Sequence, residues 1–149
     1  QRPGTQILEM GMVPVAGPAA LRLQIPVGQR VLRLYRLRLA DDEPLALEQS
    51  LVSFFGCEKL LEADLVATSL YNLLEANYGL PPIEAEQELE AGLAAEPEAG
   101  LLDIAPGSPI LLLRRTTYTE RRQPIEYAES VYRGDKYSFH TRLLRSREP

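Results

Sequence analysis

The chain has 149 residues, enough for one domain of common size, and its 45% hydrophobic and 25% charged residues suit an ordinary globular core. A single cysteine, Cys57, excludes an internal disulfide and a cysteine-rich zinc site. No apolar run reaches the roughly 18 residues that a membrane helix needs. The net charge of −5 argues against the chain itself gripping nucleic acid, because such binding is driven mainly by cations that meet phosphates.

The charge is unevenly spread along the chain. Residues 1–40 carry six basic and one acidic residue, and residues 106–149 carry nine basic and five acidic residues. Between them, residues 41–105 carry one basic and fifteen acidic residues. The two basic ends are therefore suited to a small anion rather than to a nucleic-acid backbone.

The first twenty residues are rich in glycine, proline and alanine and show no sustained period. We expect a linker and then a loop there, with a short strand at residues 7–10. A second short strand is expected at residues 21–25, before a turn at residues 26–28.

A hairpin is predicted next. Residues 30–39 alternate in polarity and predict a strand, and residues 45–52 predict a second one. Turn-forming residues fill the interval 40–44, so we expect the two strands to pair.

A helix is predicted at residues 69–78, after an ambiguous stretch at 54–61. Its leucines and a tyrosine recur at helical spacing, Thr68 or Ser69 can serve as the N-cap, and Gly79 suits the C-terminal end.

Residues 83–94 place four glutamates on one parity and mostly small or apolar residues on the other. Helix propensity would favour a helix here, whereas strict alternation favours a strand with one solvated face. We predict the strand.

The C-terminal third is predicted to begin with a short helix from residue 97 to about residue 103. Strands at residues 110–119 and 125–132 then form a hairpin, and a last strand follows at residues 137–144. Hairpins with a few helices predict an antiparallel α+β domain.

Two arginines, Arg36 and Arg38, share one face in the middle of an apolar strand. Guanidinium groups are hard to bury without a partner, so this pair predicts an anion to hold there. If the turn takes residues 41–43, Glu48 lies opposite Arg36 on the same face, where opposite charges stabilise a sheet modestly. A four-residue loop would break this match.

Further polar candidates come from two other elements. Ser69 and Tyr71 stand at the start of the predicted helix, where unpaired N–H groups favour a phosphate or a carboxylate. Glu126 and Tyr132 share a face of their strand and add a carboxylate and a phenol. Together these residues predict a pocket for a small polar molecule with an anionic end.

Each candidate also has a plain structural interpretation. An Arg-x-Arg pair on a strand is often a solvated face, and Glu48 can simply neutralise an arginine. Ser69 can be only a helix cap, and the two tyrosines can be only packing.

Other polar residues are not expected to bind. His140 is alone, so no catalytic triad or histidine metal cluster can be built, and Cys57 is expected to be a buried small hydrophobe. We predict neither a metal nor a cofactor. Four arginines are expected to be turn and surface charges rather than ligands: Arg114, Arg115, Arg121 and Arg122.

The order and spacing of several short motifs resemble one family over about residues 5–145. The motifs are residues 26–38, Glu43-Pro44, Glu48-Gln-Ser50, Ser69-Leu-Tyr-Asn-Leu-Leu-Glu75, Tyr78-Gly79, Ala85-Glu-Gln87, Gly107-Ser-Pro-Ile-Leu and Pro124-Ile-Glu-Tyr-Ala-Glu-Ser-Val-Tyr-Arg-Gly-Asp135. They resemble the UTRA domain, the C-terminal effector-binding domain of GntR-type bacterial transcription regulators of the HutC subfamily.

The resemblance implies a chorismate-lyase-like fold, a mostly antiparallel sheet flanked by helices. It also implies a cytoplasmic homodimer that binds DNA only through an upstream winged helix-turn-helix domain, which this chain lacks. Residues 1–4 are then expected to be a linker remnant, and residues 5–149 the effector-binding domain.

The resemblance also implies a set of ligand contacts. The Ser-Leu-Tyr version is similar to regulators of amino-sugar uptake, which sense phosphorylated glucosamine or N-acetylglucosamine; other relatives sense urocanate or acidic amino acids. Residues 5–10 depart from the usual Ser-Phe pattern of the first loop, so its contact is not placed. The positions that match the family's ligand contacts are Arg36, Arg38, Glu48, Ser69, Tyr71, Glu126 and Tyr132.

Two rival functions remain open. An arginine–glutamate pocket in this fold also resembles a chorismate-lyase-like enzyme that acts on a small carboxylate. The chain can also be a pure dimerisation module with a vestigial pocket.

Overall fold

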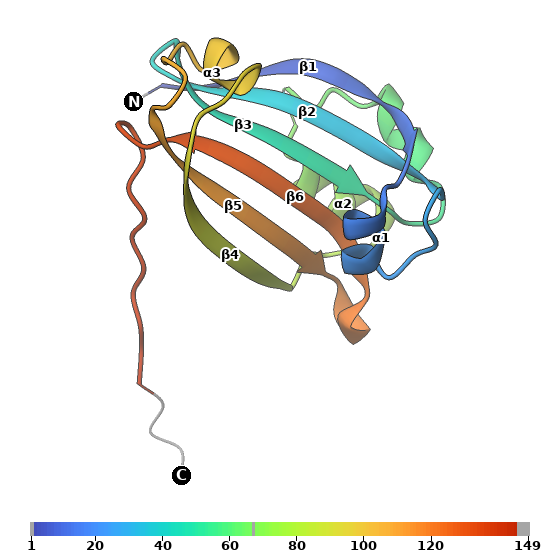
Figure 1. Ribbon diagram of the computed structural model, residues 1–149. Helices are drawn as coiled ribbons and strands as arrows, with labels where there is room; N and C mark the ends of the chain where they lie inside the picture. Colours follow the sequence, from blue (N-terminus) through green and yellow to red (C-terminus); the bar gives the residue numbers. More distant parts are fainter. Residues whose placement is uncertain (1, 67, 146–149) are drawn as a thin grey trace.

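A computed structural model describes residues 2–66 and 68–145, so residue 1 of the expected linker and residues 146–149 of the expected domain lie outside it. Its centre is one antiparallel sheet with the strand order β1-β2-β3-β6-β5-β4 (Figure 1). The strands are β1 (Pro3–Pro14), β2 (Arg30–Ala40), β3 (Glu43–Val52), β4 (Glu84–Leu93), β5 (Pro109–Tyr118) and β6 (Pro124–Arg133).

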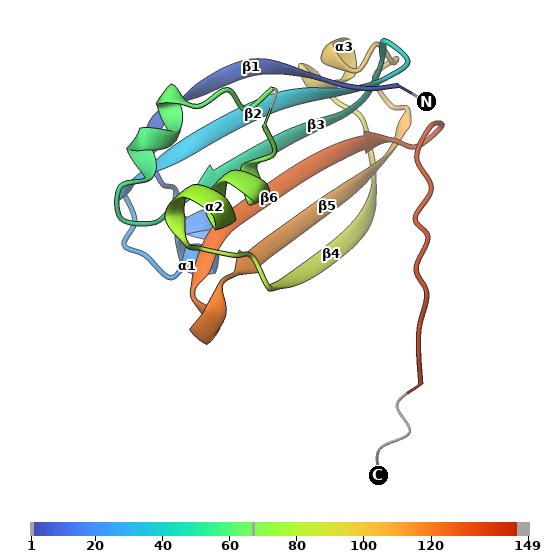
Figure 2. The same ribbon diagram turned by 180° about the vertical axis from the view of Figure 1, so that it is seen from behind.

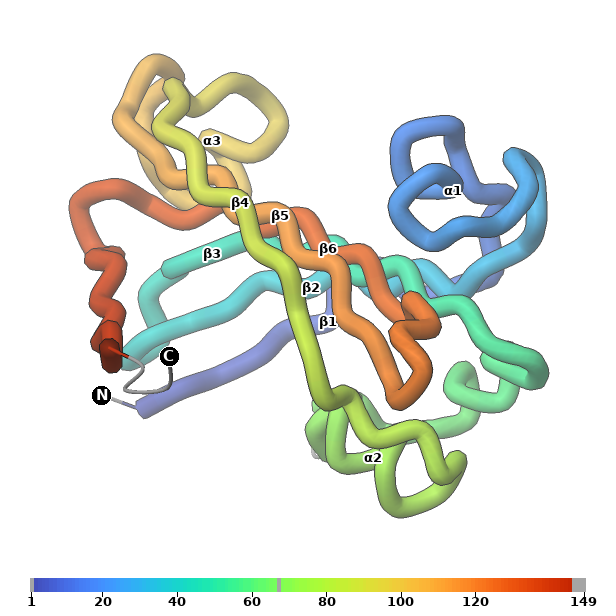
Figure 3. The backbone as a smooth tube through the Cα atoms, turned by 90° about the horizontal axis from the view of Figure 1, so that it is seen from below, coloured from blue at the N-terminus to red at the C-terminus, as the bar shows by residue number. Residues whose placement is uncertain are grey.

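Short helices lie on both faces of this sheet. The helix α2 and the 3-10 helix η1 lie over one face (Figure 2), whereas α1 and α3 lie on the opposite side (Figure 3). The helices are α1 (Gly17–Leu23), η1 (Cys57–Glu62), α2 (Leu70–Tyr78), α3 (Glu98–Leu101) and the 3-10 turn η2 (Glu120–Arg122). The fold is therefore the predicted α+β class. Among the described residues, no helix combines the length and apolar character needed to cross a membrane.

Apolar clusters hold the helices on the sheet. Leu70 and Leu74 of α2 pack with Leu32 and Leu34 of β2 on one face. On the other face, Leu23 of α1 joins a cluster with buried residues of β2, β3 and β6. Full burial of a leucine contributes about 1.5–3 kcal/mol, so these contacts hold α1 and α2 in place on the sheet.

The β2–β3 register matches the prediction. Arg36 lies opposite Glu48, although the turn consists of two residues, Asp41 and Asp42, rather than three. Both have positive φ, of 50° and 65°, as a tight hairpin turn requires. One extra residue on β3, Leu45, is skipped in the ladder and restores the expected pairing.

The helix at residues 69–78 is also confirmed. Ser69 caps α2 by accepting a hydrogen bond at Oγ from the backbone N–H of Asn72, at 3.4 Å. Gly79 ends the helix with φ of 62°, in the left-handed region that favours glycine.

The glutamate-rich segment is a strand and not a helix. β4 pairs with β5 along its whole length and forms one edge of the sheet. Nearly all of its side chains are exposed, so the segment lacks the buried apolar stripe that a helix packed on the sheet would need.

Three predictions near the ends of the chain were wrong. β1 is a strand of 12 residues, where a loop with a short strand at 7–10 was expected. Residues 21–25 do not form a strand, because residues up to Leu23 belong to the helix α1, which has Pro18 in its first turn and buries Ala19, Ala20 and Leu23.

The predicted last strand, at residues 137–144, is absent. A turn at residues 134–136 directs the chain off the sheet, and the following segment runs away from the domain (Figures 1 and 2). Leu143 and Leu144 are 87% and 82% exposed, so these two apolar side chains do not pack on the sheet as a strand would require. The ambiguous stretch at 54–61 contains the start of η1.

Candidate functional site

A cavity of about 290 Å³ lies between the sheet and the start of α2. Thr5 of β1 and Arg115 of β5 mark its width across the sheet, and the loop before α2 closes the opposite side. This volume is near the lower end of the range for small-molecule sites. The lining residues are Thr5, Arg36, Arg38, Glu48, Leu65, Val66, Thr68, Ser69, Leu70, Tyr71, Arg115 and Glu126.

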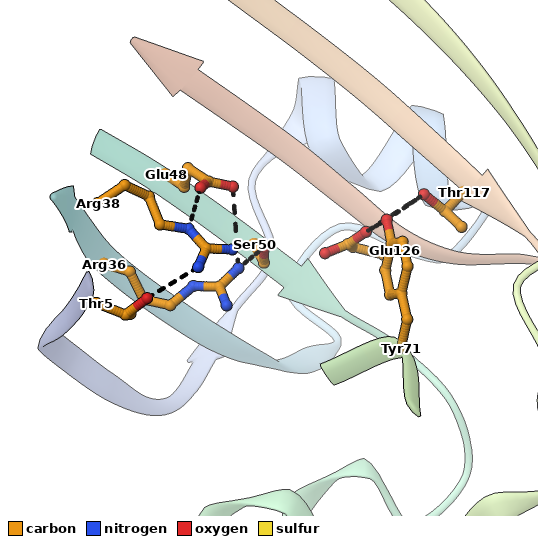
Figure 4. Close-up of polar contacts among 8 residues, drawn as sticks. All are labelled: Thr5, Arg36, Arg38, Glu48, Ser50, Tyr71, Thr117 and Glu126. Atoms are coloured by element: carbon orange, nitrogen blue, oxygen red, sulfur yellow. Dashed lines mark hydrogen bonds and ion pairs between the residues drawn. The ribbon is translucent and has the colours of Figure 1, made fainter. Parts of the chain in front are cut away.

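The two arginines of β2 meet one carboxylate. Arg38 Nε donates to Glu48 Oε1 at 2.5 Å, and Arg36 Nη2 lies 4.0 Å from Glu48 Oε2 (Figure 4). Arg38 Nη1 also donates to Thr5 Oγ1 at 2.9 Å, and Arg36 Nη2 donates weakly to Ser50 Oγ at 3.5 Å. Glu48 therefore neutralises part of the charge of both arginines, as the plain interpretation of this residue anticipated.

Burial separates the two arginines. The side chain of Arg36 is only 8% exposed, whereas that of Arg38 is 40% exposed. Burial lowers the pKa of Arg36, and Glu48 opposes that shift. Arg36 Nε is buried without a hydrogen-bond partner. Buried polar atoms are nearly always paired, so an unpaired guanidinium nitrogen beside a cavity marks a place for an acceptor.

A second polar cluster joins α2 to the other half of the sheet. Tyr71 OH donates to Glu126 Oε1 at 2.5 Å and lies 3.0 Å from Thr117 Oγ1 (Figure 4). Glu126 is 1% exposed. Burial, followed by the field of the Glu126 carboxylate, raises the pKa of Tyr71 to about 12. The phenol is therefore a hydrogen-bond donor throughout the neutral range.

Ser69 lines the cavity and caps α2 at the same time. Ser69 is exposed, and its Oγ accepts in the 3.4 Å capping bond, so the O–H group can still donate a hydrogen bond to a ligand. The start of α2 at Ser69 and Leu70 also lines the cavity, and the partial positive charge of a helix N-terminus favours an anion.

Tyr132 is the one predicted site residue that does not line the cavity. It shares the face of Glu126 on β6 and lies opposite Ala46, which is two residues before Glu48 on β3. Its ring packs on Tyr137, with 4.1 Å between the centroids. Six of the seven predicted residues thus come together, and Tyr132 lies beyond them.

Arg115 was missed by sequence reasoning, which placed it on the surface. It is half-buried, it lines the cavity, and its guanidinium lies 5.8 Å from the centre of the Tyr71 ring. Burial lowers the pKa of Arg115, but Tyr71, Glu126 and Glu48 raise it by more. The available signal was parity, because Arg115 and Thr117 share a face and Thr117 pairs with Glu126. Arg114, by contrast, pairs with Glu90 and Glu129, and Arg122 with Glu84 and Glu86, as surface charges do.

A larger depression of about 850 Å³ lies between α1 and the turns at residues 53–58 and 121–124. Phe55 at its rim is fully exposed, and Arg122 there is engaged by the glutamates of β4. It lacks the buried, partly unpaired cations of the smaller cavity, so the smaller cavity is the better candidate site.

Cys57 is buried, and no group of three acidic, cysteine or histidine residues suited to a metal occurs in the described part of the chain.

Comparison with known proteins agrees with this geometry. The family model "UTRA domain" matches residues 1–138. The HTH-type transcriptional repressor NagR of Bacillus subtilis is 35% identical over 137 residues, which are 92% of this chain and 56% of that protein. The chain thus spans about half the length of the curated relatives it matches.

Solved structures show the same architecture. The C-terminal domain of the histidine utilization repressor from Pseudomonas syringae has a TM-score of 0.86 and 28% identity, with 97% of this chain and all of that chain covered. The effector domain of PhnF from Mycobacterium smegmatis has a TM-score of 0.89 and 25% identity, with 97% and 88% covered. The chain belongs to the UTRA domain family, found in GntR-type bacterial transcription regulators of the HutC subfamily.

Proposed function

We propose that this domain is the ligand-sensing part of a bacterial transcription regulator and that its effector is a small anion bound in the cavity beneath α2. The observation that carries the proposal is the charge of the lining: three arginines and two glutamates, with a buried, unpaired guanidinium nitrogen on Arg36 and another on Arg115. Such nitrogens are costly unless an acceptor reaches them. A phosphate or carboxylate of the effector supplies that acceptor.

A phosphorylated sugar or amino sugar is the proposed effector class. Arg36, Arg38 and the start of α2 at Ser69 and Tyr71 hold the phosphate. The carboxylate of Glu126 accepts from sugar hydroxyl or amide groups, together with Glu48 and, if the ligand extends that far, Tyr132. The Ser69-Leu-Tyr71 sequence supports this class, because it is the version similar to regulators of amino-sugar uptake.

Effector binding is proposed to act on a DNA-binding domain upstream of this chain, within a cytoplasmic homodimer. The relatives named as repressors and regulators are about twice as long as this chain, which supports a second domain in the whole protein. Ligand binding then shifts how the dimer places its DNA-binding domains, a coupling that is typically worth about 1–3 kcal/mol.

Titration calorimetry with glucosamine-6-phosphate and N-acetylglucosamine-6-phosphate tests the effector class directly. We expect saturable binding of at least one of them. No heat of binding from either at millimolar concentration would rule out the sugar-phosphate proposal. Release of 4-hydroxybenzoate from added chorismate would instead favour the rival enzyme, against which the regulator names of the relatives speak.

A further inference from the structure

Arg115 lies in the same row of the sheet as the polar residues of the proposed site. In the β5–β6 ladder it is opposite Ala128, and Ala128 is opposite Ser50 of β3. Cross-strand partners project from the same face, so the side chain of Arg115 projects toward α2. Its neighbour Arg114 has the opposite parity and meets the exposed carboxylates of Glu90 and Glu129.

The three cavity arginines differ in how far their charge is compensated. Arg38 has a 2.5 Å ion pair with Glu48, and Arg36 has the same carboxylate at 4.0 Å. For Arg115, no carboxylate within 4.0 Å and no hydrogen bond is found in the described part of the chain, and its guanidinium lies 5.8 Å from the centre of the Tyr71 ring. Its Nε is buried and unpaired.

The buried carboxylate of Glu126 does not pair with Arg115 either. Glu126 accepts from Tyr71 at 2.5 Å and from Thr117 at 3.3 Å through the same oxygen, Oε1. Its field reaches Arg115 without a direct contact. Nearby negative charge therefore stabilises the charge of Arg115, but no acceptor occupies its N–H groups. The planar guanidinium is available to bind a ligand.

We propose that Arg115 is a further specificity-determining residue of the cavity, a cation whose contact with the anionic group, beside those of Arg36 and Arg38, makes the site prefer a phosphorylated ligand over its neutral parent. This inference rests on the proposed sensing function and adds a third cation to Arg36 and Arg38. The guanidinium above the Tyr71 ring and the start of α2 at Ser69 line one cavity, so they can contact the same anion from two sides.

Arg115→Gln removes the charge and keeps a polar side chain, and Arg114→Gln on the adjacent exposed position is the matched control. In calorimetry, we expect Arg115→Gln to weaken N-acetylglucosamine-6-phosphate binding by tenfold or more. Binding of unphosphorylated N-acetylglucosamine should change by less than about twofold, because that ligand lacks the anionic group. Arg115→Lys, which keeps the charge but not the fork, should recover part of the lost affinity.

Inorganic phosphate is a probe that does not depend on the sugar. Under matched ionic strength, phosphate should raise the melting temperature of the wild type and of Arg114→Gln, and raise that of Arg115→Gln much less. An equal phosphate response in Arg115→Gln and wild type, or no response in the wild type, would overturn the role of Arg115. A phosphate response that depends on Arg115, combined with no binding of either sugar phosphate, would overturn only the proposed effector class.

Discussion

Arg36 faces Glu48 directly across the β2–β3 ladder, yet the short ion pair of Glu48 is with Arg38, the next residue on the same face. One carboxylate therefore contacts two guanidinium groups and cannot fully neutralise both of their charges. The more buried arginine has the weaker bond, which is the reverse of what stability alone would favour. Such an arrangement leaves positive charge facing the cavity when no ligand is bound.

Arg38→Ala should weaken binding of an anionic effector by tenfold or more, because it removes the more accessible of the two β2 guanidiniums. Calorimetry with the sugar phosphates measures the effect. Arg33→Ala is the control, since Arg33 lies on the same strand but on the other face, where it pairs with Glu9 and Gln49. Equal losses in the two variants would show that strand integrity, and not the cavity, sets the affinity.

Glu48→Gln should destabilise the ligand-free domain by about 2 kcal/mol or more, because Arg36 and Arg38 lose their shared counter-ion in a mostly buried place. Chemical denaturation measures the change. In Glu9→Gln, which breaks the exposed pair with Arg33, the change should stay within about 0.5 kcal/mol. Added phosphate should stabilise Glu48→Gln more than wild type; a smaller effect would contradict the assignment of the anion to this cluster.

Ser69 caps α2, and its proposed role as a ligand contact can be separated from that cap. Ser69→Ala should cost about 1 kcal/mol of stability through loss of the cap, whereas Ser69→Gly should cost only a few tenths. Both variants remove the hydroxyl, so both should weaken phosphate binding to a similar extent. If affinity follows stability, with Ser69→Gly close to wild type, Ser69 acts only as a cap.

Tyr71 gives the domain a pH dependence at alkaline pH. Its pKa is about 12 in the folded protein against about 10 when unfolded, so the folded state holds its proton between these values. The unfolded state then binds fewer protons, and stability must fall as the pH rises from about 10 through 12. Denaturation series should show a smaller decline over this interval in Tyr71→Phe than in wild type, and matching declines would refute the shift.

Strand parity was enough to predict much of the lining of the cavity. Arg36, Arg38 and Glu48 are close in sequence, and their hairpin register follows from a short turn and an apolar pattern. The predicted three-residue turn was incorrect in detail, but a bulge at Leu45 compensates for the missing residue. Local patterns of this kind are readable without a structure.

Arg115 and Tyr132 show where sequence reasoning ends. Their positions relative to the cavity depend on the β3–β6 pairing and on where α2 lies, which are contacts between residues far apart in the chain. Parity places two adjacent arginines on opposite faces of the strand, but only the strand pairing and the position of α2 show which of them faces the cavity. The missing last strand has a similar cause, since an apolar alternation cannot show whether a neighbouring strand is available.

The sheet order gives the cavity one further property. Strands β1 to β3 form one half of the sheet and β4 to β6 the other, and the single β3–β6 ladder joins them. Arg36 and Glu48 belong to the first half, Arg115 and Glu126 to the second, and Tyr71 comes from the connecting segment. A molecule in the cavity thus contacts both halves and acts as a non-covalent cross-link between them. Its binding energy resists their separation, so occupancy of the site and cohesion of the sheet are thermodynamically linked.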